Sequence, residues 1–226
     1  MLEFKLSTVL IETFMRRKVN KAVKYKILFA LSAKFSQTYQ QSFLFQFKIY
    51  WSNVETEVIT TYVGLGSNLG DRAGNLLLAV RGLMEASFTV NKLSAIYETE
   101  PLGVDESEEH AAYLNMVAEI CVTNISPSQM LARMLRIEYL LGRREKTLLK
   151  PRTVDLDLLF YGDHETNSEF LVVPHPRLHE RKFVLVPLAE LAPHFVHPTL
   201  NKIIQELLYT VEDDSKVKRW IPKSAI

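Results

Sequence analysis

Glycine and proline are confined to one part of this 226-residue chain. All eight Gly and all nine Pro lie beyond residue 57. These residues divide a compact fold into elements and turns, so residues 1–57 lack the usual signals of a folded domain. Residues 58–226 are long enough for one ordinary domain. The sequence therefore predicts a domain over residues 58–226 that is preceded by an extension.

The extension also differs from the rest in charge. Residues 1–57 carry nine Lys and Arg against four Glu, a net charge of +5, which leaves −4 for the remainder because the whole chain carries +1. Three interpretations stay open: an organellar targeting peptide, a helical arm whose basic face meets a membrane or nucleic acid, or an extension without function.

Composition limits the partners of the domain. A slightly acidic body argues against bulk electrostatic binding of nucleic acid. The single cysteine, Cys121, allows no internal disulfide and fits a reducing compartment. Apolar runs are much shorter than the roughly 20 residues of a membrane-spanning helix. We expect a cytoplasmic monomer that binds small molecules and neither nucleic acid nor membrane, or an organellar protein if residues 1–57 are a transit peptide.

Alternation and helical periodicity predict the order strand, helix, strand, strand, helix, strand. This order predicts an α+β fold, a sandwich with an antiparallel or mixed sheet. We expect strands over 59–65, 89–99, 113–122 and 153–161, an edge strand over 170–173, and later helices over 183–191 and 202–209. The first helix has an apolar stripe of Leu76, Leu77, Val80, Leu83 and Met84.

The second helix has explicit start and stop signals. Ser126 is placed as the N-cap, Pro127 as the first helical residue, and Gln129 as the partner in a capping box. Gly142 stands where a C-terminal cap is expected. The predicted buried stripe of this helix consists of Met130, Leu131, Met134, Leu135 and Leu141.

Two aspartates interrupt the apolar strand of residues 154–160. Asp155 and Asp157 project from one face because strand side chains alternate, with their backbones roughly 7 Å apart. Two such carboxylates repel each other, and a shared cation removes this cost. Mg²⁺ prefers one or two carboxylates together with water and phosphate oxygens. The pair predicts a magnesium platform for a nucleotide; a solvent-facing strand edge is the alternative.

A basic segment, residues 143–152, leads into this strand. Arg143 and Arg152 would stand near the carboxylates, where guanidinium groups bind phosphate oxygens with fixed geometry. The combination favours a metal–triphosphate site over a surface network of ion pairs. The chain contains no Walker-type phosphate loop. Three other glycines are interpreted as turn residues: Gly64, Gly66 and Gly70.

An aromatic and amide constellation forms the second candidate site. Tyr113 and Asn115 share one face of a predicted strand, and Phe183 follows later in the chain. An aromatic ring beside an amide suits a flat heterocycle, which stacks on the ring and hydrogen-bonds to the amide. Ordinary core packing is the alternative.

Six motifs follow one another along the chain: Gly66-Ser67-Asn68-Leu69-Gly70-Asp71, Tyr97-Glu98-Thr99-Glu100-Pro101-Leu102-Gly103, Tyr113-Leu114-Asn115, Gly142-Arg143, Pro151-Arg152-Thr153-Val154-Asp155-Leu156-Asp157 and Pro174-His175-Pro176-Arg177. In this order they resemble the 6-hydroxymethyl-7,8-dihydropterin pyrophosphokinase family over about residues 60–208. The resemblance implies a ferredoxin-like α/β sandwich. It also implies transfer of pyrophosphate from ATP to the hydroxymethyl group of the pterin, with release of AMP, in folate biosynthesis.

The resemblance implies a role for individual residues. Asp155 and Asp157 would bind two Mg²⁺ ions that bridge the ATP phosphates, and Asp157 is also a candidate acceptor of the hydroxyl proton. The implied catalytic residues are Arg143, Arg152, Asp155 and Asp157. The implied ATP-binding residues are Glu138, Arg143, Arg152, His175 and Arg181. The implied pterin-binding residues are Thr99, Leu102, Tyr113, Asn115 and Phe183.

The basic segment departs from the family pattern. It is short, and it carries Thr147-Leu148-Leu149 where relatives often carry Arg and Trp. The resemblance implies a lid that closes over both substrates. The departures concern lid closure and leave both aspartates intact, so a relative that binds pterin or nucleotide without catalysis is the competing hypothesis.

Overall fold

The computed structural model describes residues 57–100, 112–142 and 152–222. Residues 1–56, residues 101–111 and nearly all of the basic segment lie outside this range, as do Leu102 and Arg143. No helix in the described residues is long and apolar enough to cross a membrane.

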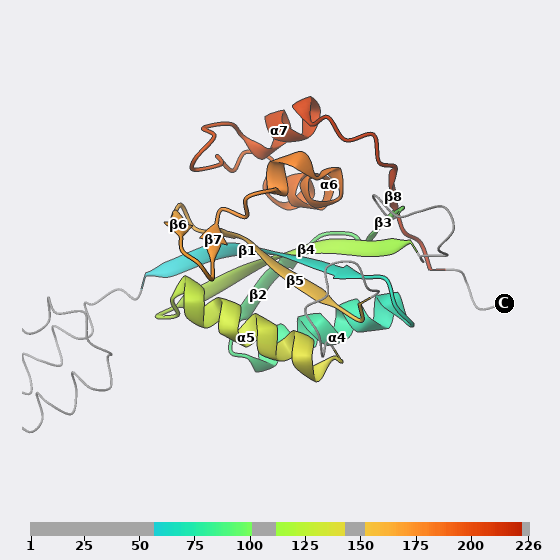
Figure 1. The fold of residues 1–226 in the computed structure, drawn as a ribbon, viewed down its shortest axis with the longest axis horizontal. Helices are drawn as coiled ribbons and strands as arrows, with labels where there is room; N and C mark the ends of the chain where they lie inside the picture. Colours follow the sequence, from blue (N-terminus) through green and yellow to red (C-terminus); the bar gives the residue numbers. More distant parts are fainter. Residues whose placement is uncertain (1–56, 101–111, 143–151, 223–226) are drawn as a thin grey trace, which may run out of the picture. The chain divides into compact units, whose positions relative to one another are not determined.

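One antiparallel sheet organises the domain (Figure 1). Its strand order is β5-β1-β4-β3-β8, and β2 also pairs with β4. A separate two-stranded sheet joins β6 and β7. The strands are β1 (Val58–Ser67), β2 (Thr89–Leu93), β3 (Tyr97–Thr99), β4 (Tyr113–Thr123), β5 (Asp155–Tyr161), β6 (Thr166–Asn167), β7 (Val172–Val173) and β8 (Val217–Arg219).

Helices cover both faces of the sheet (Figure 1). The helices α4 (Arg72–Glu85) and α5 (Pro127–Leu140) pack on one face. The helices α6 (Lys182–Leu191) and α7 (Ile204–Thr210) lie on the other, beside the 3₁₀ turn η1 (Leu178–Glu180). Each face therefore has its own apolar core. The predicted α+β sandwich, with a mostly antiparallel sheet flanked by helices, is confirmed.

The capping box predicted for α5 is confirmed. The Ser126 hydroxyl accepts from the Gln129 amide at 3.3 Å, and the Gln129 side chain accepts from the Ser126 amide at 2.9 Å. Gly142 follows the helix with φ +104°, a conformation that glycine adopts without strain. The predicted stripe of α5 omitted Ile137 and Glu138, which are both buried.

The stripe predicted for α4 was partly wrong. Leu76, Val80 and Leu83 are buried, whereas Leu77 and Met84 face solvent. Ala79 completes the buried stripe, because its small side chain lets the helix approach the sheet.

The single strand predicted over residues 89–99 is two strands, and Ser94 causes the break. The Ser94 hydroxyl accepts from the Val117 amide at 2.9 Å, while its own amide donates to the Val117 carbonyl. The side chain thus replaces a main-chain partner in the ladder. As a result β2 and β3 pair with separate parts of the long strand β4.

The edge strand predicted over residues 170–173 is shorter than expected. Only Val172 and Val173 form β7, while Phe170 is 82% exposed. The short strands β6 and β8 were not predicted, because two or three residues are too few for a period to be seen.

Helix α4 provides a test of the packing. We expect Leu83→Ala to lower the free energy of unfolding by about 2–5 kcal/mol, because Leu83 is fully buried and its removal leaves a cavity. The matched control is Leu77→Ala on the same helix. We expect this substitution to change the free energy of unfolding by less than about 0.5 kcal/mol. Chemical denaturation of both variants makes the comparison, and equal losses would contradict the burial of Leu83 against the sheet.

Candidate active site

The two aspartates of β5 point away from the core under α4 and α5. Leu156 and Leu158, which alternate with them, are buried in that core. The carboxylates therefore project from the opposite face, as the alternation predicted. The Asp155 and Asp157 side chains are 30% and 37% exposed, so solvent and ligands can reach them.

A strip of bare backbone runs beside these acids. Gly64 and Gly66 of β1 pair with Asp157 and Asp155 of β5. A Cβ atom on Gly66 would lie 3.1 Å from Asn115 Oδ1, and one on Gly64 would lie 3.8 Å from Asp157 Cβ. The interpretation of these two glycines as turn residues was wrong, since they lie inside β1. They open a space between the acids and Asn115.

Each carboxylate has an arginine partner. Arg152 Nη1 lies 2.7 Å from Asp155 Oδ2, and Arg181 Nη1 lies 3.8 Å from Asp157 Oδ2. Burial lowers the pKa of Arg181, although a guanidinium keeps its charge at neutral pH. These partners reduce the repulsion between the two acids, and both cations can also bind phosphate.

Asn68 holds Arg152 in place, a role that was not predicted from the sequence. The Arg152 amide donates to Asn68 Oδ1 at 2.6 Å, and the Asn68 amide donates to the Arg152 carbonyl at 3.2 Å. The pair joins the turn after β1 to the entry of β5. The available signal was the motif Gly66-Ser67-Asn68, in which a short amide side chain follows a strand end.

His175 is neutral in this environment. Burial first, and the positive charge of Arg181 second, lower the pKa of its imidazole to about 4. Its Nδ1 accepts a hydrogen bond from the Arg177 amide at 3.2 Å. A neutral imidazole that accepts at Nδ1 carries its proton on Nε2. His175 is therefore a donor beside Arg181 that can serve an anionic ligand without adding charge.

The aromatic and amide residues line the other side of the glycine strip. Asn115 Nδ2 donates to Thr99 Oγ1 at 2.7 Å, and both residues are almost fully buried. Burial raises the pKa of the Tyr113 hydroxyl, Arg152 opposes this rise and Asp155 adds to it. Tyr113 thus lies within electrostatic range of the Arg152–Asp155 pair.

Phe183 borders the site from the first turn of α6. The Arg181 guanidinium lies 5.6 Å from the centre of the Phe183 ring, a cation–π distance. The structure therefore brings Phe183 next to the Asp157–Arg181 pair, while Tyr113 lies near the other carboxylate.

Glu138 contacts the site through the backbone. Its side chain is buried on α5, and Oε1 accepts from the Leu156 amide at 2.8 Å. Leu156 lies between the two aspartates. Glu138 thus helps to hold the strand that carries them, and its predicted contact with ATP stays a prediction.

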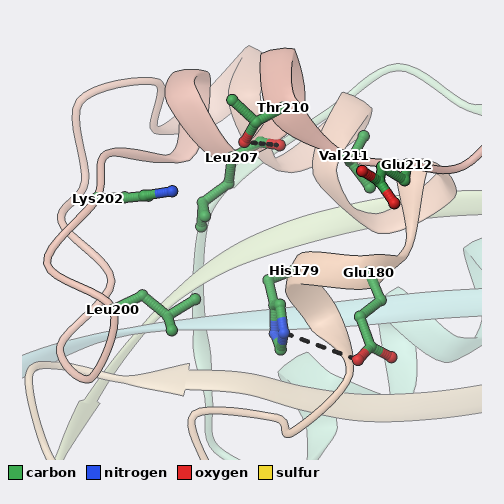
Figure 2. A pocket seen from close by; sticks show the side chains of 8 residues that line it. All are labelled: His179, Glu180, Leu200, Lys202, Leu207, Thr210, Val211 and Glu212. Atoms are coloured by element: carbon green, nitrogen blue, oxygen red, sulfur yellow. Dashed lines mark hydrogen bonds and ion pairs between the residues drawn. The ribbon is translucent and has the colours of Figure 1, made fainter.

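A separate cavity of about 540 Å³ lies between η1 and α7 (Figure 2). None of the predicted site residues lines it. His179 and Glu180 line this cavity from η1, with His179 Nε2 3.8 Å from Glu180 Oε1, and the next residue in the chain is Arg181. Its lining residues are His179, Glu180, Leu200, Lys202, Leu207, Thr210, Val211 and Glu212.

Comparison with known proteins identifies the family. Residues 62–193, more than half of the chain, match the family described as 7,8-dihydro-6-hydroxymethylpterin-pyrophosphokinase (HPPK). The chain belongs to the HPPK family. The resemblance inferred from the six motifs is confirmed.

Named relatives agree with this membership. The chain is 40% identical over 166 residues to the 2-amino-4-hydroxy-6-hydroxymethyldihydropteridine pyrophosphokinase of Bacillus subtilis (strain 168). This match covers 73% of this chain and 92% of the Bacillus protein. It is 37% identical over 139 residues to the "Folate synthesis bifunctional protein, mitochondrial" of Arabidopsis thaliana. That match covers 62% of this chain and 24% of the plant protein.

A solved structure shares the fold. The wild-type HPPK-DHPS of Plasmodium falciparum, crystallised with pteroate, superposes with a TM-score of 0.55 at 16% sequence identity. The match covers 69% of this chain and 44% of that chain, so this chain spans less than half of the Plasmodium protein. The HPPK fold, an α+β ferredoxin-like sandwich, is thus shared at low identity.

Gly66→Ala tests the glycine strip. The added methyl would lie 3.1 Å from Asn115 Oδ1, so we expect Asn115 to shift and its hydrogen bond with Thr99 to weaken. Binding of a hydroxymethyl pterin should weaken by about tenfold, the scale of one lost hydrogen bond to a buried group.

The matched control is Gly64→Ala. The added Cβ there finds its nearest neighbour, Leu159 Cδ2, at 3.6 Å, an ordinary contact. Calorimetric titration with the pterin compares both variants with the unmodified protein. Equal affinity for Gly66→Ala and the unmodified protein would show that the strip is not close to the pterin.

Proposed function

We propose that residues 58–226 form an active pyrophosphokinase domain. It transfers the pyrophosphoryl group of ATP to 6-hydroxymethyl-7,8-dihydropterin and releases AMP, in folate biosynthesis. The observation that carries this proposal is the arrangement on one sheet face. Two aspartates, each paired with an arginine, lie across bare glycine backbone from the buried amide Asn115, and Phe183 borders the Asp157–Arg181 pair.

Asp155 and Asp157 would hold magnesium, and we propose two ions. In the described residues no three His, Cys, Asp or Glu side chains form a metal-binding group, and the two carboxylates are the protein ligands that we assign. This donor set fits Mg²⁺, which takes one or two carboxylates and completes its shell with phosphate and water. Bound magnesium would supply charge neutralisation at the phosphate oxygens.

The cationic residues would bind and orient ATP. Arg152 and Arg181 already stand beside the carboxylates, and neutral His175 offers an Nε2 proton. Such groups position the triphosphate and stabilise the charge that develops during transfer. Asp157 is the candidate acceptor of the pterin hydroxyl proton. We also assign Arg143 and Glu138 to the ATP site, and Arg143 lies outside the described residues.

The opposite side would hold the pterin. Tyr113 and Phe183 would sandwich the flat ring, an arrangement that buries both ring faces. Asn115 and Thr99 would hydrogen-bond to the edge of the ring. We also assign Leu102 to the pterin site, and this residue lies outside the described residues. Because Asn115 and Thr99 already hydrogen-bond to each other, their orientation is set before the ligand arrives.

We propose that the domain acts as a monomer and that residues 1–57 are an extension outside the catalytic unit. The location is the cytoplasm, or an organelle if the extension acts as a transit peptide. Small molecules are its proposed partners, and neither nucleic acid nor membrane is among them.

The reaction itself provides the first test. With the full chain, AMP should form only when ATP, Mg²⁺ and the hydroxymethyl pterin are all present, as followed by separation of the nucleotides. Equal AMP formation without the pterin would refute the proposed transfer. If both ligands bind tightly and no AMP forms, the chain is a binding protein without catalysis, which the altered basic segment favours.

The aspartates provide the second test. We expect Asp155→Asn and Asp157→Asn each to lower kcat/KM by at least about a hundredfold, the scale of losing a positioned electrostatic group. Asp163→Asn is the control, because that side chain is 97% exposed in the turn after β5. The kcat/KM of this control should stay within about twofold of the value for the unmodified protein. A loss below threefold for either site variant would remove that aspartate from the proposal.

A further inference from the structure

The short strand β3 carries part of the proposed pterin site. Thr99 is its last residue, and Thr99 pairs with Tyr113, the first residue of β4. The ladder between β3 and β4 has only three residue pairs. The strand β8, itself three residues long, pairs with the same residues of β3 on the other side. Strands with so few pairs open easily, so the relative position of Thr99 and Tyr113 needs support from outside these ladders.

Arg72, the first residue of α4, supplies such support from the other face of the sheet. Its Nη1 donates to the Ala112 carbonyl at 2.5 Å and lies 2.9 Å from Glu98 Oε1. Ala112 immediately precedes Tyr113, and Glu98 immediately precedes Thr99. Arg72 Nη1 therefore connects Glu98 and Ala112, the residues that precede Thr99 and Tyr113.

Alternation explains why Arg72 itself is not in the site. Tyr97, two residues before Thr99, donates its hydroxyl to Glu190 of α6, so Tyr97 and Thr99 face the α6 side. Glu98 faces the α4 side, where Arg72 meets it. Arg72 thus acts on the site from behind the sheet, through the Glu98 side chain and the Ala112 carbonyl.

We infer that Arg72 is a positioning residue for pterin binding: it holds the ends of β3 and β4 so that Thr99, Asn115 and Tyr113 keep their spacing. The inference rests on the proposed function. We expect the consequence to be selective. The proposed ATP residues lie on and around β5 and η1, whereas the side-chain hydrogen bond and ion pair of Arg72 in the described residues go to Ala112 and Glu98.

The same helix offers a matched control. Arg81 Nε lies 2.8 Å from Glu85 Oε1, close to the 2.9 Å between Arg72 and Glu98. Both Arg81 and Glu85 belong to α4 and face solvent. Arg81→Gln removes the same kind of side chain and charge without affecting strand position. Any general effect of losing an arginine from α4 should appear in both variants.

The experiment measures binding of the pterin and of Mg²⁺-ATP separately by calorimetry, with thermal unfolding, for the full chain and its variants. We expect Arg72→Gln to weaken pterin binding about five- to twentyfold, the scale of one or two charge-assisted hydrogen bonds. ATP affinity should stay within about twofold. Arg72→Lys, which keeps a donor and the charge, should recover part of the pterin affinity. Arg81→Gln should change neither affinity.

Other outcomes overturn the inference. If Arg72→Gln binds pterin like Arg81→Gln, Arg72 has no positioning role. If pterin and ATP affinities fall together with the unfolding temperature, its role is general stability. If the unmodified protein binds ATP and not the pterin, the proposed function is wrong. This result is distinct from a failure of the Arg72 inference, because it is seen in the unmodified protein without any variant.

Discussion

The pairing of β1 with β5 on one side and β4 on the other is the contact on which the site depends. It sets Gly64 and Gly66 between the two aspartates and Asn115. A Cβ atom on Gly66 would crowd Asn115 Oδ1 at 3.1 Å, whereas one on Gly64 would make an ordinary contact with Leu159. Because β1 presents only backbone there, groups from two strands that are not neighbours can reach one ligand.

Charge is balanced within the site before a ligand binds. Two carboxylates on one strand face destabilise each other, and their arginine partners offset this cost. A magnesium–nucleotide complex carries both kinds of charge, so it can satisfy the carboxylates through the metal and the arginines through its phosphates. Neutral His175 adds a hydrogen-bond donor without a further buried charge, which would be costly next to Arg181.

Much of the fold could be predicted because it is encoded locally. The capping box of α5 and the alternation of β4 and β5 depend on residues within a few positions of each other. The predictions failed where a tertiary contact changed a local pattern. Ser94 divides a run that looks like one strand, because its hydroxyl bonds to Val117. The glycines of β1 resemble turn residues until their partners on both sides are known.

The sequence by itself was enough to predict the candidate site residues, since Asp155, Asp157, Arg152 and the aromatic and amide residues stand out by residue type and spacing. Only the tertiary structure decided how they are held together. Asn68 and Arg152 are 84 residues apart in the chain, and Arg72 and Ala112 are 40 apart. Residue type and local period carry no information about such contacts, because they form only after the strands have paired and the helices have packed on the sheet.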